Sequence, residues 1–373
     1  MASDRIVLAH GGGGRLMEQL IEDVFLPAFG GLSSHERHDG ARVDGSLVLT
    51  TDSYVVRPLF FPGGSIGDLA VNGTVNDLAM CGARPRWLSA SFILEEGLPL
   101  GTLRRVVDDM ARAARAAKVH IVTGDTKVVE RGAADGLFIT TAGAGYVEFG
   151  ARSAPSLVEP GDGILISGET GAHGIAVLSV REGLAFDSEI VSDTAPLWPQ
   201  VETLLRAGVE IHCLRDLTRG GLASALNEIA KARGVELEIE EPAIPVAAPV
   251  RAACEFLGLD PLYVANEGCF CAFIHPTSVP RALELLRRFN PHAALIGRAG
   301  EEGRPRVITR SAIGGRRQID LDGQPTAGRV GGRDRAPHCL DEAAGHRKAE
   351  PHTVGGVLVA EPLKRREQVR LGT

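Results

Sequence analysis

The chain has 373 residues, of which 44% are hydrophobic and 23% charged, a composition typical of a globular protein long enough for two domains. Its formal net charge is −7, so we expect no nucleic-acid partner. The N-terminus lacks a charged-then-apolar signal pattern, and no stretch is long and apolar enough to span a bilayer. We therefore expect a cytoplasmic protein with no membrane association.

The first half of the chain predicts both strands and helices. Residues 15–29 repeat apolar side chains at helical spacing, and β-branched and aromatic runs between glycines and prolines indicate strands. Helices are expected at 15–29, 66–80 and 100–117, and strands at 46–56, 86–94, 119–125 and 136–149.

A break rich in Pro, Gly and Ser at 151–163 predicts a domain boundary, giving domains over 1–150 and 151–322. Neither half alternates strand and helix regularly, so the fold class expected for both is α+β. In the second half we expect helices at 172–183, 197–207, 220–233, 246–257 and 278–289, and strands at 164–168, 235–240, 262–268, 269–275 and beyond 294.

Four aspartates stand beside glycine or polar turn residues: Asp52 in TTDSY, Asp77 in VNGTVNDLAM, Asp125 in VTGDTK and Asp216 in LRDLTRGG. Carboxylates at such turns suit Mg²⁺, which in nucleotide sites bridges one or two carboxylates to phosphate. The lysine-centred phosphate loop GxxxxGK[ST] is absent, so an ATP site here would depend on metal and glycine-rich backbone. The alternative is that each aspartate only caps a helix or forms a turn.

His10 and the glycines that follow it, Gly11, Gly12, Gly13 and Gly14, predict flexible backbone that folds over phosphate. The same HGGG pattern occurs in lipase-like hydrolases, and residues 63–67 spell GxSxG. A nucleophile elbow needs a strand running into the first glycine, however, and Pro62 stands there. The hydrolase interpretation is therefore the weaker one. The CxC of Cys269 and Cys271 is interpreted as strand packing rather than metal binding.

The segments HGGGGRLMEQLI, GDLAVNGTVNDLAM, GDTKVV, LRDLTRGG and ANEG occur in that order along the chain. In this combination the sequence resembles the PurM-like, or aminoimidazole ribonucleotide synthetase-like, family of ATP-dependent enzymes, and within it the HypE-like hydrogenase maturation factors. The resemblance implies a two-domain α+β architecture in which the N-terminal domains of two copies pair as a homodimer, with ATP near their interface.

The resemblance also implies roles for individual residues. Asp52, Asp77, Asp125 and Asp216 would hold Mg²⁺ and thereby ATP, while the glycine segment from His10 would contact phosphate. Asp68 and Asn72, one helical turn apart, would orient metal or phosphate. Lys127 would contact the reacting carboxamide, and Glu267 in ANEG is the candidate base. Outside the resemblance, Lys127 reads as a surface lysine and Glu267 as a turn residue.

The reaction that the resemblance implies is the ATP-dependent dehydration of a cysteine S-carboxamide to a thiocyanate, which supplies cyanide to the iron of [NiFe]-hydrogenase. The implied partners are a HypF-like carbamoyltransferase and a HypC/HypD-like iron scaffold. The alternatives are a catalytically impaired ATP-binding scaffold, or another enzyme of the family such as a selenophosphate synthetase.

The last segment, 323–373, departs from the family. It holds no Phe, Tyr or Trp, and we expect it to be disordered. HypE-like chains end in Pro-Arg-Ile-Cys, whose cysteine is the working thiol, whereas the nearest substitute here is Cys339 in APHCLDE. Three interpretations stay open: an upstream reading-frame change has replaced the native tail, the chain is a paralogue that has lost the thiol, or Cys339 acts as the working thiol instead.

Overall fold

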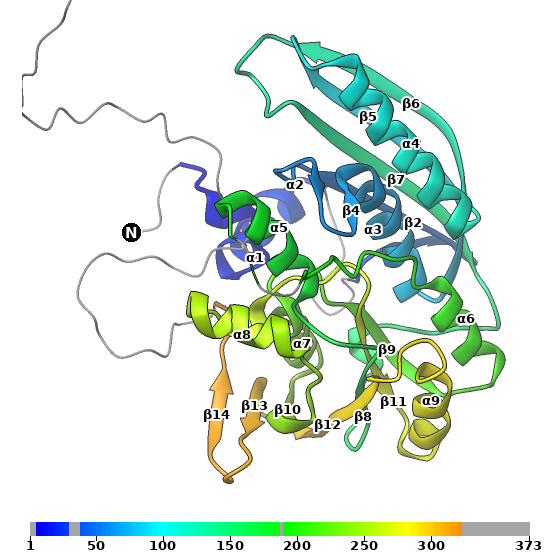
Figure 1. The fold of residues 1–373 in the computed structure, drawn as a ribbon. Coiled ribbons are helices and arrows are strands. Elements are labelled where there is room, and N and C mark those ends of the chain that lie inside the picture. The colour runs from blue at the N-terminus through cyan, green and yellow to red at the C-terminus, as the bar shows by residue number, and fades with distance from the viewer. Residues whose placement is uncertain (1–4, 30–37, 185, 187–188, 323–373) are drawn as a thin grey trace, which may run out of the picture. The chain divides into compact units, whose positions relative to one another are not determined.

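The computed structural model describes residues 5–29, 38–184, 186 and 189–322. The predictions for 323–373, including Cys339, concern residues outside these ranges. The N-terminal segment follows the predicted helical spacing as a short 3₁₀ turn, then α1, a π-helical turn and α2 (Figure 1). Their bounds are η1 (Leu8–Gly11), α1 (Arg15–Leu20), η2 (Ile21–Phe25) and α2 (Leu26–Phe29). Among the described residues, no helix has the length and apolar character needed to cross a membrane.

The first sheet has five strands in the order β1-β2-β7-β5-β6, all antiparallel to their neighbours except β5 and β6, which are parallel. Helices α3 (Ile66–Met80) and α4 (Leu100–Ala117) pack against it, and a short hairpin, β3 (Phe60–Phe61) and β4 (Gly64–Ser65), precedes α3. The sheet strands are β1 (Ala41–Asp44), β2 (Leu47–Tyr54), β5 (Ala83–Glu95), β6 (His120–Val129) and β7 (Leu137–Val147).

Helix α3 is the central helix of the described chain. Fourteen of its fifteen residues, apolar and polar alike, are buried, and Asp77 is the one that is not. Its first turn is capped by Ser65, whose hydroxyl accepts from the Gly67 N–H at 3.2 Å, while Asp68 accepts from the Ser65 N–H at 3.0 Å. A helix buried on all sides has no solvated face. The partial exposure of Asp77 therefore marks an opening in the packing.

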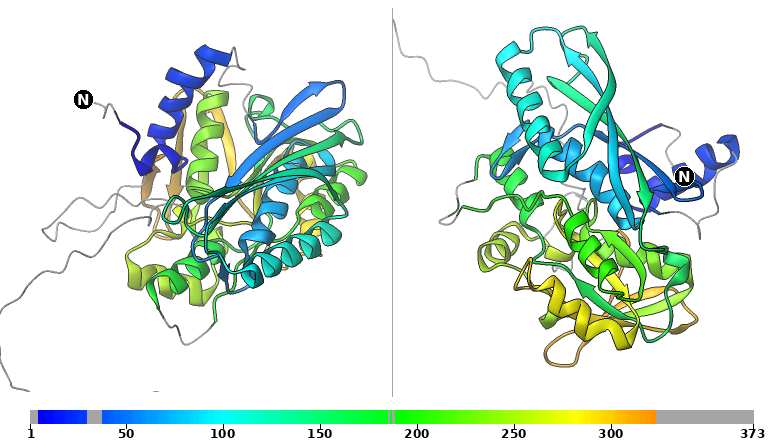
Figure 2. Two further views of the ribbon diagram at one scale, coloured as in Figure 1. Left: turned by 90° about the horizontal axis from the view of Figure 1, so that it is seen from above. Right: turned by 90° about the vertical axis from the view of Figure 1, so that its right-hand side faces the viewer.

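The second sheet has seven strands in the order β14-β13-β10-β12-β8-β11-β9 (Figure 1). Figure 2 shows the same ribbon in two further views. Its central strands β8 and β11 are buried along their whole length, because helices cover both faces. The strands are β8 (Gly163–Ile166), β9 (Ile211–Asp216), β10 (Val235–Glu240), β11 (Phe270–Ile274), β12 (Ala294–Glu302), β13 (Arg306–Arg310) and β14 (Arg316–Ile319).

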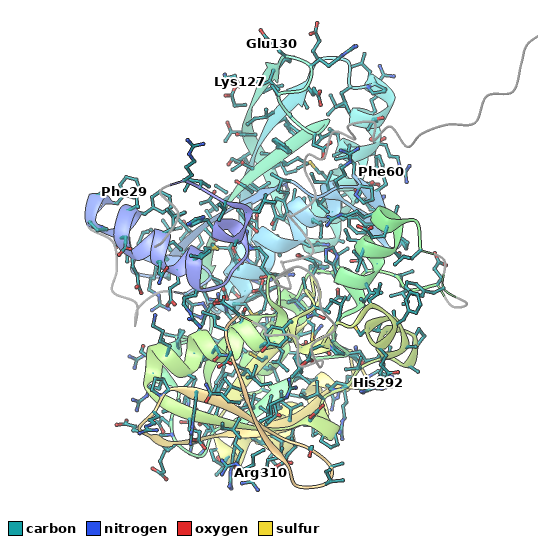
Figure 3. All side chains as sticks on the ribbon, turned by 90° about the vertical axis from the view of Figure 1, so that its left-hand side faces the viewer. Phe29, Phe60, Lys127, Glu130, His292 and Arg310 are labelled. Carbon is teal, nitrogen blue, oxygen red and sulfur yellow. The ribbon has the colours of Figure 1, made fainter. Side chains whose placement is uncertain are left out.

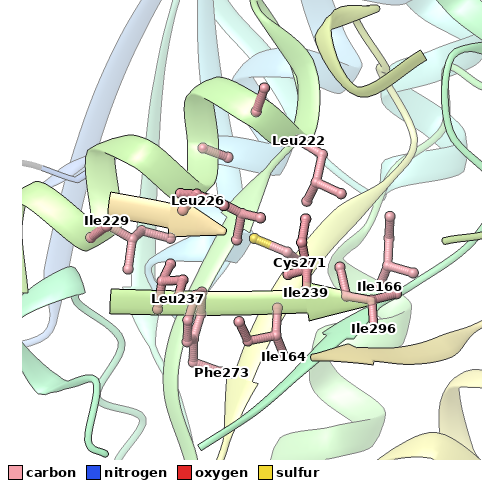
Figure 4. Close-up of a cluster of buried hydrophobic side chains, with 14 of the residues drawn as sticks. Ile164, Ile166, Leu222, Leu226, Ile229, Leu237, Ile239, Cys271, Phe273 and Ile296 are labelled. Atoms are coloured by element: carbon pink, nitrogen blue, oxygen red, sulfur yellow. The ribbon is translucent and has the colours of Figure 1, made fainter. Parts of the chain in front are cut away.

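Helix α7 (Gly221–Arg233) covers one face of this sheet, and the side chains of Leu222, Leu226 and Ile229 meet Ile164 and Phe273 of the sheet there (Figure 4). Helices α6 (Trp198–Arg206) and α9 (Val279–Leu286) cover the other face, where the end of α3 joins them. Helices α5 (Ala172–Glu182) and α8 (Ala248–Leu257) form a smaller cluster beside α7. Both cysteines of the CxC pair, Cys269 and Cys271, are buried in this core, as expected from strand packing.

The α+β fold class is confirmed, and most of the expected helices and strands are present. One strand prediction is wrong: residues 262–268 hold a 3₁₀ turn, η5 (Pro261–Tyr263), and then an irregular loop. Strands β1 and β9 and the hairpin β3–β4 were not predicted. One sheet is built from residues 41–147 and the other from 163–319. The functional division of the chain at residue 150 remains a prediction.

Candidate functional site

A cavity of about 330 Å³ lies where β2 and α3 of the first half meet β9 and α7 of the second, with α1 as a further wall. This volume is within the range of small-molecule sites. Its polar lining is rich in carboxylates, together with three cations. The charged residues that line it are Glu18, Asp39, Asp52, Asp77, Arg215, Asp216, Arg219, Glu228 and Lys231.

Three of these carboxylates form a cluster. Asp39, Asp77 and Asp216 each offer one oxygen, and these oxygens all lie within 4.8 Å of one another. Asp77 is the one partly exposed position of α3, Asp216 ends β9, and Asp39 precedes β1. The Thr50 hydroxyl on β2 donates to Asp77 Oδ2 at 2.7 Å, which holds that carboxylate in place.

The electrostatics of the cluster follow from crowding like charges away from water. Burial, then the charges of Asp216, Asp39 and Asp52, raise the pKa of Asp77 well above its ordinary value. Burial and the charge of Asp39 raise the pKa of Asp216 to about 8. Burial of Asp39 also acts to raise its pKa, but Arg215 and His38 outweigh it and hold the pKa below the ordinary value.

Arg215 is the cation built into this wall. Its guanidinium contacts Asp39 Oδ1 at 2.7 Å and donates to Glu228 Oε2 at 2.6 Å. Both carboxylates therefore have a fixed partner, whereas the charges of Asp77 and Asp216 face each other. Helix α7 thus supplies Glu228 to hold the arginine that orients Asp39.

The donor set of the cluster suits a divalent cation of the Mg²⁺ type. The groups are hard carboxylate oxygens that come from three separate segments and converge without a bridging lysine or arginine between Asp77 and Asp216 among the described contacts. The raised pKa values of these two acids are the signature of a site whose charge a cation would neutralise. Asp52 lines the same cavity next to them.

The turn after Asp216 carries the DLTRGG motif and connects β9 to α7. Gly220 and Gly221 have φ of 73° and 59°, in the left-handed region that favours glycine. A Cβ on Gly221 would stand 2.6 Å from the carbonyl oxygen of Leu262. Only glycine therefore lets this turn pass so close to the loop at 262–264, and the turn brings Thr218 and Arg219 to the cavity.

The N-terminal glycine segment lies at the cavity in part. Gly13 and Gly14 line it, whereas His10, Gly11 and Gly12 are not among the lining residues. The Arg15 N–H donates to Asp322 Oδ1 at 2.9 Å, and Lys231 pairs with Glu18 of α1 at 2.5 Å. These contacts hold α1 against α7 as a wall of the cavity.

A second, smaller cavity of about 50 Å³ adjoins the first, and the two share Asp52, Thr218 and Arg219. Glu267 lines it, together with Tyr54 and His173. Burial raises the pKa of Tyr54 well above its ordinary value, and the charges of Asp52 and Glu267 add to the effect. The Glu267 and Asp52 carboxylates therefore both lie near Tyr54. Asp52 lines both cavities and Glu267 lines the smaller one.

Two predicted site residues lie elsewhere. Asp125 and Lys127 stand on β6, where they form an ion pair at 2.9 Å with both side chains mostly exposed (Figure 3, Lys127). The Lys127 hydrogen bond lowers the pKa of Asp125. Neither residue lines the cavity of Asp77 and Asp216. The expectation that Asp125 joins these aspartates is therefore not met within one chain.

Asp68 and Asn72 also have other contacts. Asp68 caps α3 and pairs with Arg112 of α4 at 3.0 Å, and Asn72 donates to Thr194 Oγ1 at 3.2 Å. Neither lines the larger cavity. These contacts join the start of α3 to its neighbours. The phosphate role of both residues remains a prediction.

Sequence analysis missed Asp39, Arg215 and Glu228. Asp39 belongs to HDG, a turn-forming tripeptide ahead of a short strand, and this was the available signal. Arg215 stands directly before Asp216 on a strand that was not predicted. Glu228 lies two turns into α7, where nothing in its spacing separates it from a solvated helix face.

Comparison with known proteins places this site in a family. The model of the AIR synthase related protein N-terminal domain matches residues 38–147, and that of the C-terminal domain matches 159–310. Carbamoyl dehydratase HypE of Azotobacter vinelandii is 51% identical over 320 residues, covering 84% of this chain and 94% of that protein. Carbamoyl dehydratase HypE of Escherichia coli (strain K12) is 46% identical, covering 85% and 97%.

Solved structures agree. The chain superposes on a HypE in complex with ATP with a TM-score of 0.73 and 47% identity, covering 86% of this chain and 99% of that one. For a HypE from a HypE–HypF complex the TM-score is 0.78, with 46% identity and coverage of 81% and 99%. The chain belongs to the AIR synthase related, or PurM-like, family. Within that family it is one of the HypE hydrogenase maturation proteins, which confirms the resemblance seen in the sequence.

Proposed function

We propose that this chain is an ATP-dependent carbamoyl dehydratase that converts a cysteine S-carboxamide to a thiocyanate. The convergence of Asp39, Asp77 and Asp216 in one cavity, with Glu267 at an adjoining cavity, carries the proposal. A metal-bound triphosphate in the first cavity would place its terminal phosphate toward the second. The ATP complex of a HypE relative and the name carbamoyl dehydratase given to other relatives support it.

The chain's residues have distinct parts in ATP binding. Asp77 and Asp216, with Asp39 and Asp52 beside them, would hold Mg²⁺, which when bound neutralises phosphate charge. The backbone at Gly13 and Gly14 approaches the cavity without side chains in the way, and Arg219 and Lys231 add positive charge to its walls. Binding in this way positions the γ-phosphate without a lysine-centred phosphate loop.

Phosphorylation makes the departure of the amide oxygen feasible. The carboxamide oxygen attacks the γ-phosphorus, the bond from phosphorus to ADP breaks, and a C–O–P linkage forms. Glu267 takes one proton from the amide nitrogen. The C–O bond then breaks, its electron pair leaves with phosphate, and the second nitrogen proton goes to that phosphate as the C≡N bond forms. S-carboxamide and ATP thus give thiocyanate, ADP, phosphate and the proton that Glu267 releases.

Lys127 would come from a second copy of the chain. Nine of the ten residues of β6 are exposed, and β6 is an edge of the first sheet. Exposed edges offer unpaired backbone groups to another strand, and Val122 and Val128 on β6 are 60% and 68% exposed. Pairing of two such edges in a homodimer would bury these side chains and bring Asp125 and Lys127 to the neighbouring site.

The thiol would reach the site along the route that the last described residues take. Leu321 lines the larger cavity and Asp322 contacts Arg15 at its rim, while Tyr263 donates to the Asp320 carbonyl at 2.9 Å. A segment attached after Asp322 therefore starts at the mouth of the cavity. The proposed partners are a HypF-like carbamoyltransferase, which would load this thiol, and a HypC/HypD-like iron scaffold, which would receive the cyanide. A HypE–HypF complex is known among the relatives.

The proposed reaction is tested on a protein that carries the acceptor cysteine at a defined position. Residues after Asp322 are replaced by a short flexible segment that ends in Pro-Arg-Ile-Cys, and the cysteine is converted to its S-carboxamide. We expect Mg²⁺ and ATP to cause the loss of one water from this residue, measured by mass spectrometry, with one ADP formed for each water lost. The Glu267→Gln form of the same protein is the control and should convert at least about 100-fold more slowly, at a rate that is still measurable. ATP binding without conversion would instead favour the ATP-binding scaffold, and ATP cleavage without loss of water would favour another enzyme of the family.

A further inference from the structure

The loop that carries Glu267 has no regular secondary structure, although Glu267 lines a cavity where its position matters. Irregular backbone holds one conformation only when its polar groups have fixed partners. The contacts of this loop, Ala265–Gly268, show which side chains provide them. Two of its partners are the side chains of Asn76 and Asp193, which lie outside the loop.

Asp193 binds the loop from one side. Its Oδ1 accepts from the Glu267 N–H and its Oδ2 from the Gly268 N–H, both at 3.0 Å. Two adjacent backbone donors on one carboxylate fix the orientation of the peptide between them. A Cβ on Gly268 would lie 1.8 Å from the Asp193 carbonyl oxygen, so this close approach requires glycine.

Asn76 binds the loop from the other side. Its Nδ2 donates to the Glu267 carbonyl at 3.2 Å and to the Ala195 carbonyl at 3.1 Å, and its Oδ1 accepts from the Leu197 N–H at 2.8 Å. Asn76 is almost wholly buried, with 1% of its surface exposed. The backbone N–H and C=O of Glu267 are therefore both bound by side chains from distant parts of the chain.

Asn76 immediately precedes Asp77 on α3. Successive residues of a helix point in directions about 100° apart, so one helix presents Asp77 to the aspartate cluster and Asn76 to the loop of Glu267. The rigid, buried helix α3 thereby sets the distance between the phosphate-binding and proton-accepting parts of the site.

We propose that Asn76 and Asp193 are positioning residues: this clamp of two side chains holds the backbone of Glu267 and so directs its carboxylate into the smaller cavity. The role of Glu267 as base rests on the proposed function. The clamp, meaning the hydrogen bonds of Asn76 and Asp193 to the backbone of residues 267 and 268, does not. Neither Asn76 nor Asp193 lines either cavity. Their effect on the reaction passes through Glu267.

The clamp itself is tested by amide hydrogen exchange in the otherwise unaltered chain. Asp193→Ala should speed the exchange of the 265–268 segment at least about 10-fold, because two N–H groups lose their acceptor. Asp162→Ala is the matched control: Asp162 is a buried carboxylate that accepts from the Glu159 N–H at 2.8 Å, far from this loop in the sequence. Unchanged exchange at 265–268 in Asp193→Ala, or the same increase there in Asp162→Ala, would overturn the inference.

The effect on chemistry is tested with the S-carboxamide protein described above. Asp193→Asn and Gly268→Ala should each lower the rate of conversion about 10- to 100-fold, with little change in the affinity for Mg²⁺ and ATP. Gly303→Ala is the control for the glycine variant, since a Cβ there meets no heavy atom within 4 Å. Asp193→Asn should cause no further loss in the Glu267→Gln background.

These outcomes separate the two proposals. If Asp193→Asn acts through a general structural defect, it should lower the conversion rate of the Glu267→Gln protein by the same factor as it lowers that of the unaltered protein. That result overturns the positioning role. If Asp193→Ala shows the exchange effect but the S-carboxamide protein without further substitutions does not convert, the proposed function is overturned and the clamp stands. Exchange effects without any difference in rate between Asp193→Asn and Asp162→Asn overturn the positioning role alone.

Discussion

The carboxylates of Asp77 and Asp216 come from different halves of the chain, yet their oxygens lie within 4.8 Å of each other, with Asp39 beside them. Asp77 belongs to the buried helix α3, which packs against the first sheet. Asp216 is the last residue of β9 in the second sheet. The folded chain keeps two acids close together against their mutual repulsion. Such an arrangement costs stability, and the cation proposed above would relieve the repulsion.

Removing the charge of Asp77 or Asp216 should weaken the binding of Mg²⁺ and ATP without lowering the stability of the metal-free protein. Asp77→Asn and Asp216→Asn should each lower the Mg²⁺-dependent affinity for ATP by at least about 10-fold, measured by calorimetry. Without metal, both variants should unfold at the same or a higher temperature than the unaltered chain, because the repulsion is relieved. Asp135→Asn, which breaks an exposed ion pair with Arg57, is the control and should change neither quantity much. Unchanged Mg²⁺-dependent affinity in Asp77→Asn would refute the assignment.

The raised pKa values predict a pH dependence for metal binding. The pKa of Asp216 is about 8 and that of Asp77 is also raised, so below pH 8 the metal-free chain holds protons that Mg²⁺ must displace. The folded chain then binds more protons than the unfolded one, so its metal-free stability falls as pH rises from the ordinary carboxyl range toward 8. Added Mg²⁺ should therefore raise the melting temperature more at pH 8.5 than at pH 6.5. Equal increments at both values would contradict the protonation described here.

Two of the three clustered aspartates could be predicted from the sequence. The third aspartate and its arginine partner could not, for a physical reason. Asp77 and Asp216 belong to motifs whose glycines and turn residues identify them one at a time. Asp39 and Arg215 enter the site because β9 packs beside the chain leading into β1, and no local pattern records such a contact between distant segments. Asp68 shows the same limit. Its motif predicted a role in orienting metal or phosphate, but the motif does not indicate that its carboxylate caps the helix to which it belongs.

Asp68 supplies a test of that structural assignment. Asp68→Ala removes the acceptor of the Ser65 N–H, which is buried, and the ion pair with Arg112. We expect a loss of about 1–3 kcal/mol in the free energy of unfolding, measured by urea denaturation. Arg112→Ala, whose side chain is mostly exposed, should lose less than about 1 kcal/mol. The affinity for Mg²⁺ and ATP should stay the same in both, and a selective loss of ATP binding in Asp68→Ala would restore the phosphate role.

The position of Lys127 predicts that the complete site needs two chains. Ser91 on β5 pairs with Asp125 on β6 and with Thr140 on β7, and Thr140 pairs with Ser53 on β2, next to Asp52. Three strand spacings thus separate β2 from β6, or about 14 Å. A lysine at the far edge of the sheet does not reach Asp52 across that distance, whereas one on the edge of a second copy can approach from outside.

Complementation decides between the two arrangements. Asp216→Ala and Lys127→Ala should each abolish conversion of the S-carboxamide when present in both chains of the proposed homodimer. A heterodimer that carries one of each, purified through two different tags, should recover about half the wild-type rate, because one of its two equivalent sites then has both residues. If Lys127 acts within its own chain, each site of the heterodimer lacks one residue, and no activity returns. Inactivity of a stable heterodimer would therefore place Lys127 and Asp216 of the same chain in one site, contrary to the separation of β2 and β6 in the sheet.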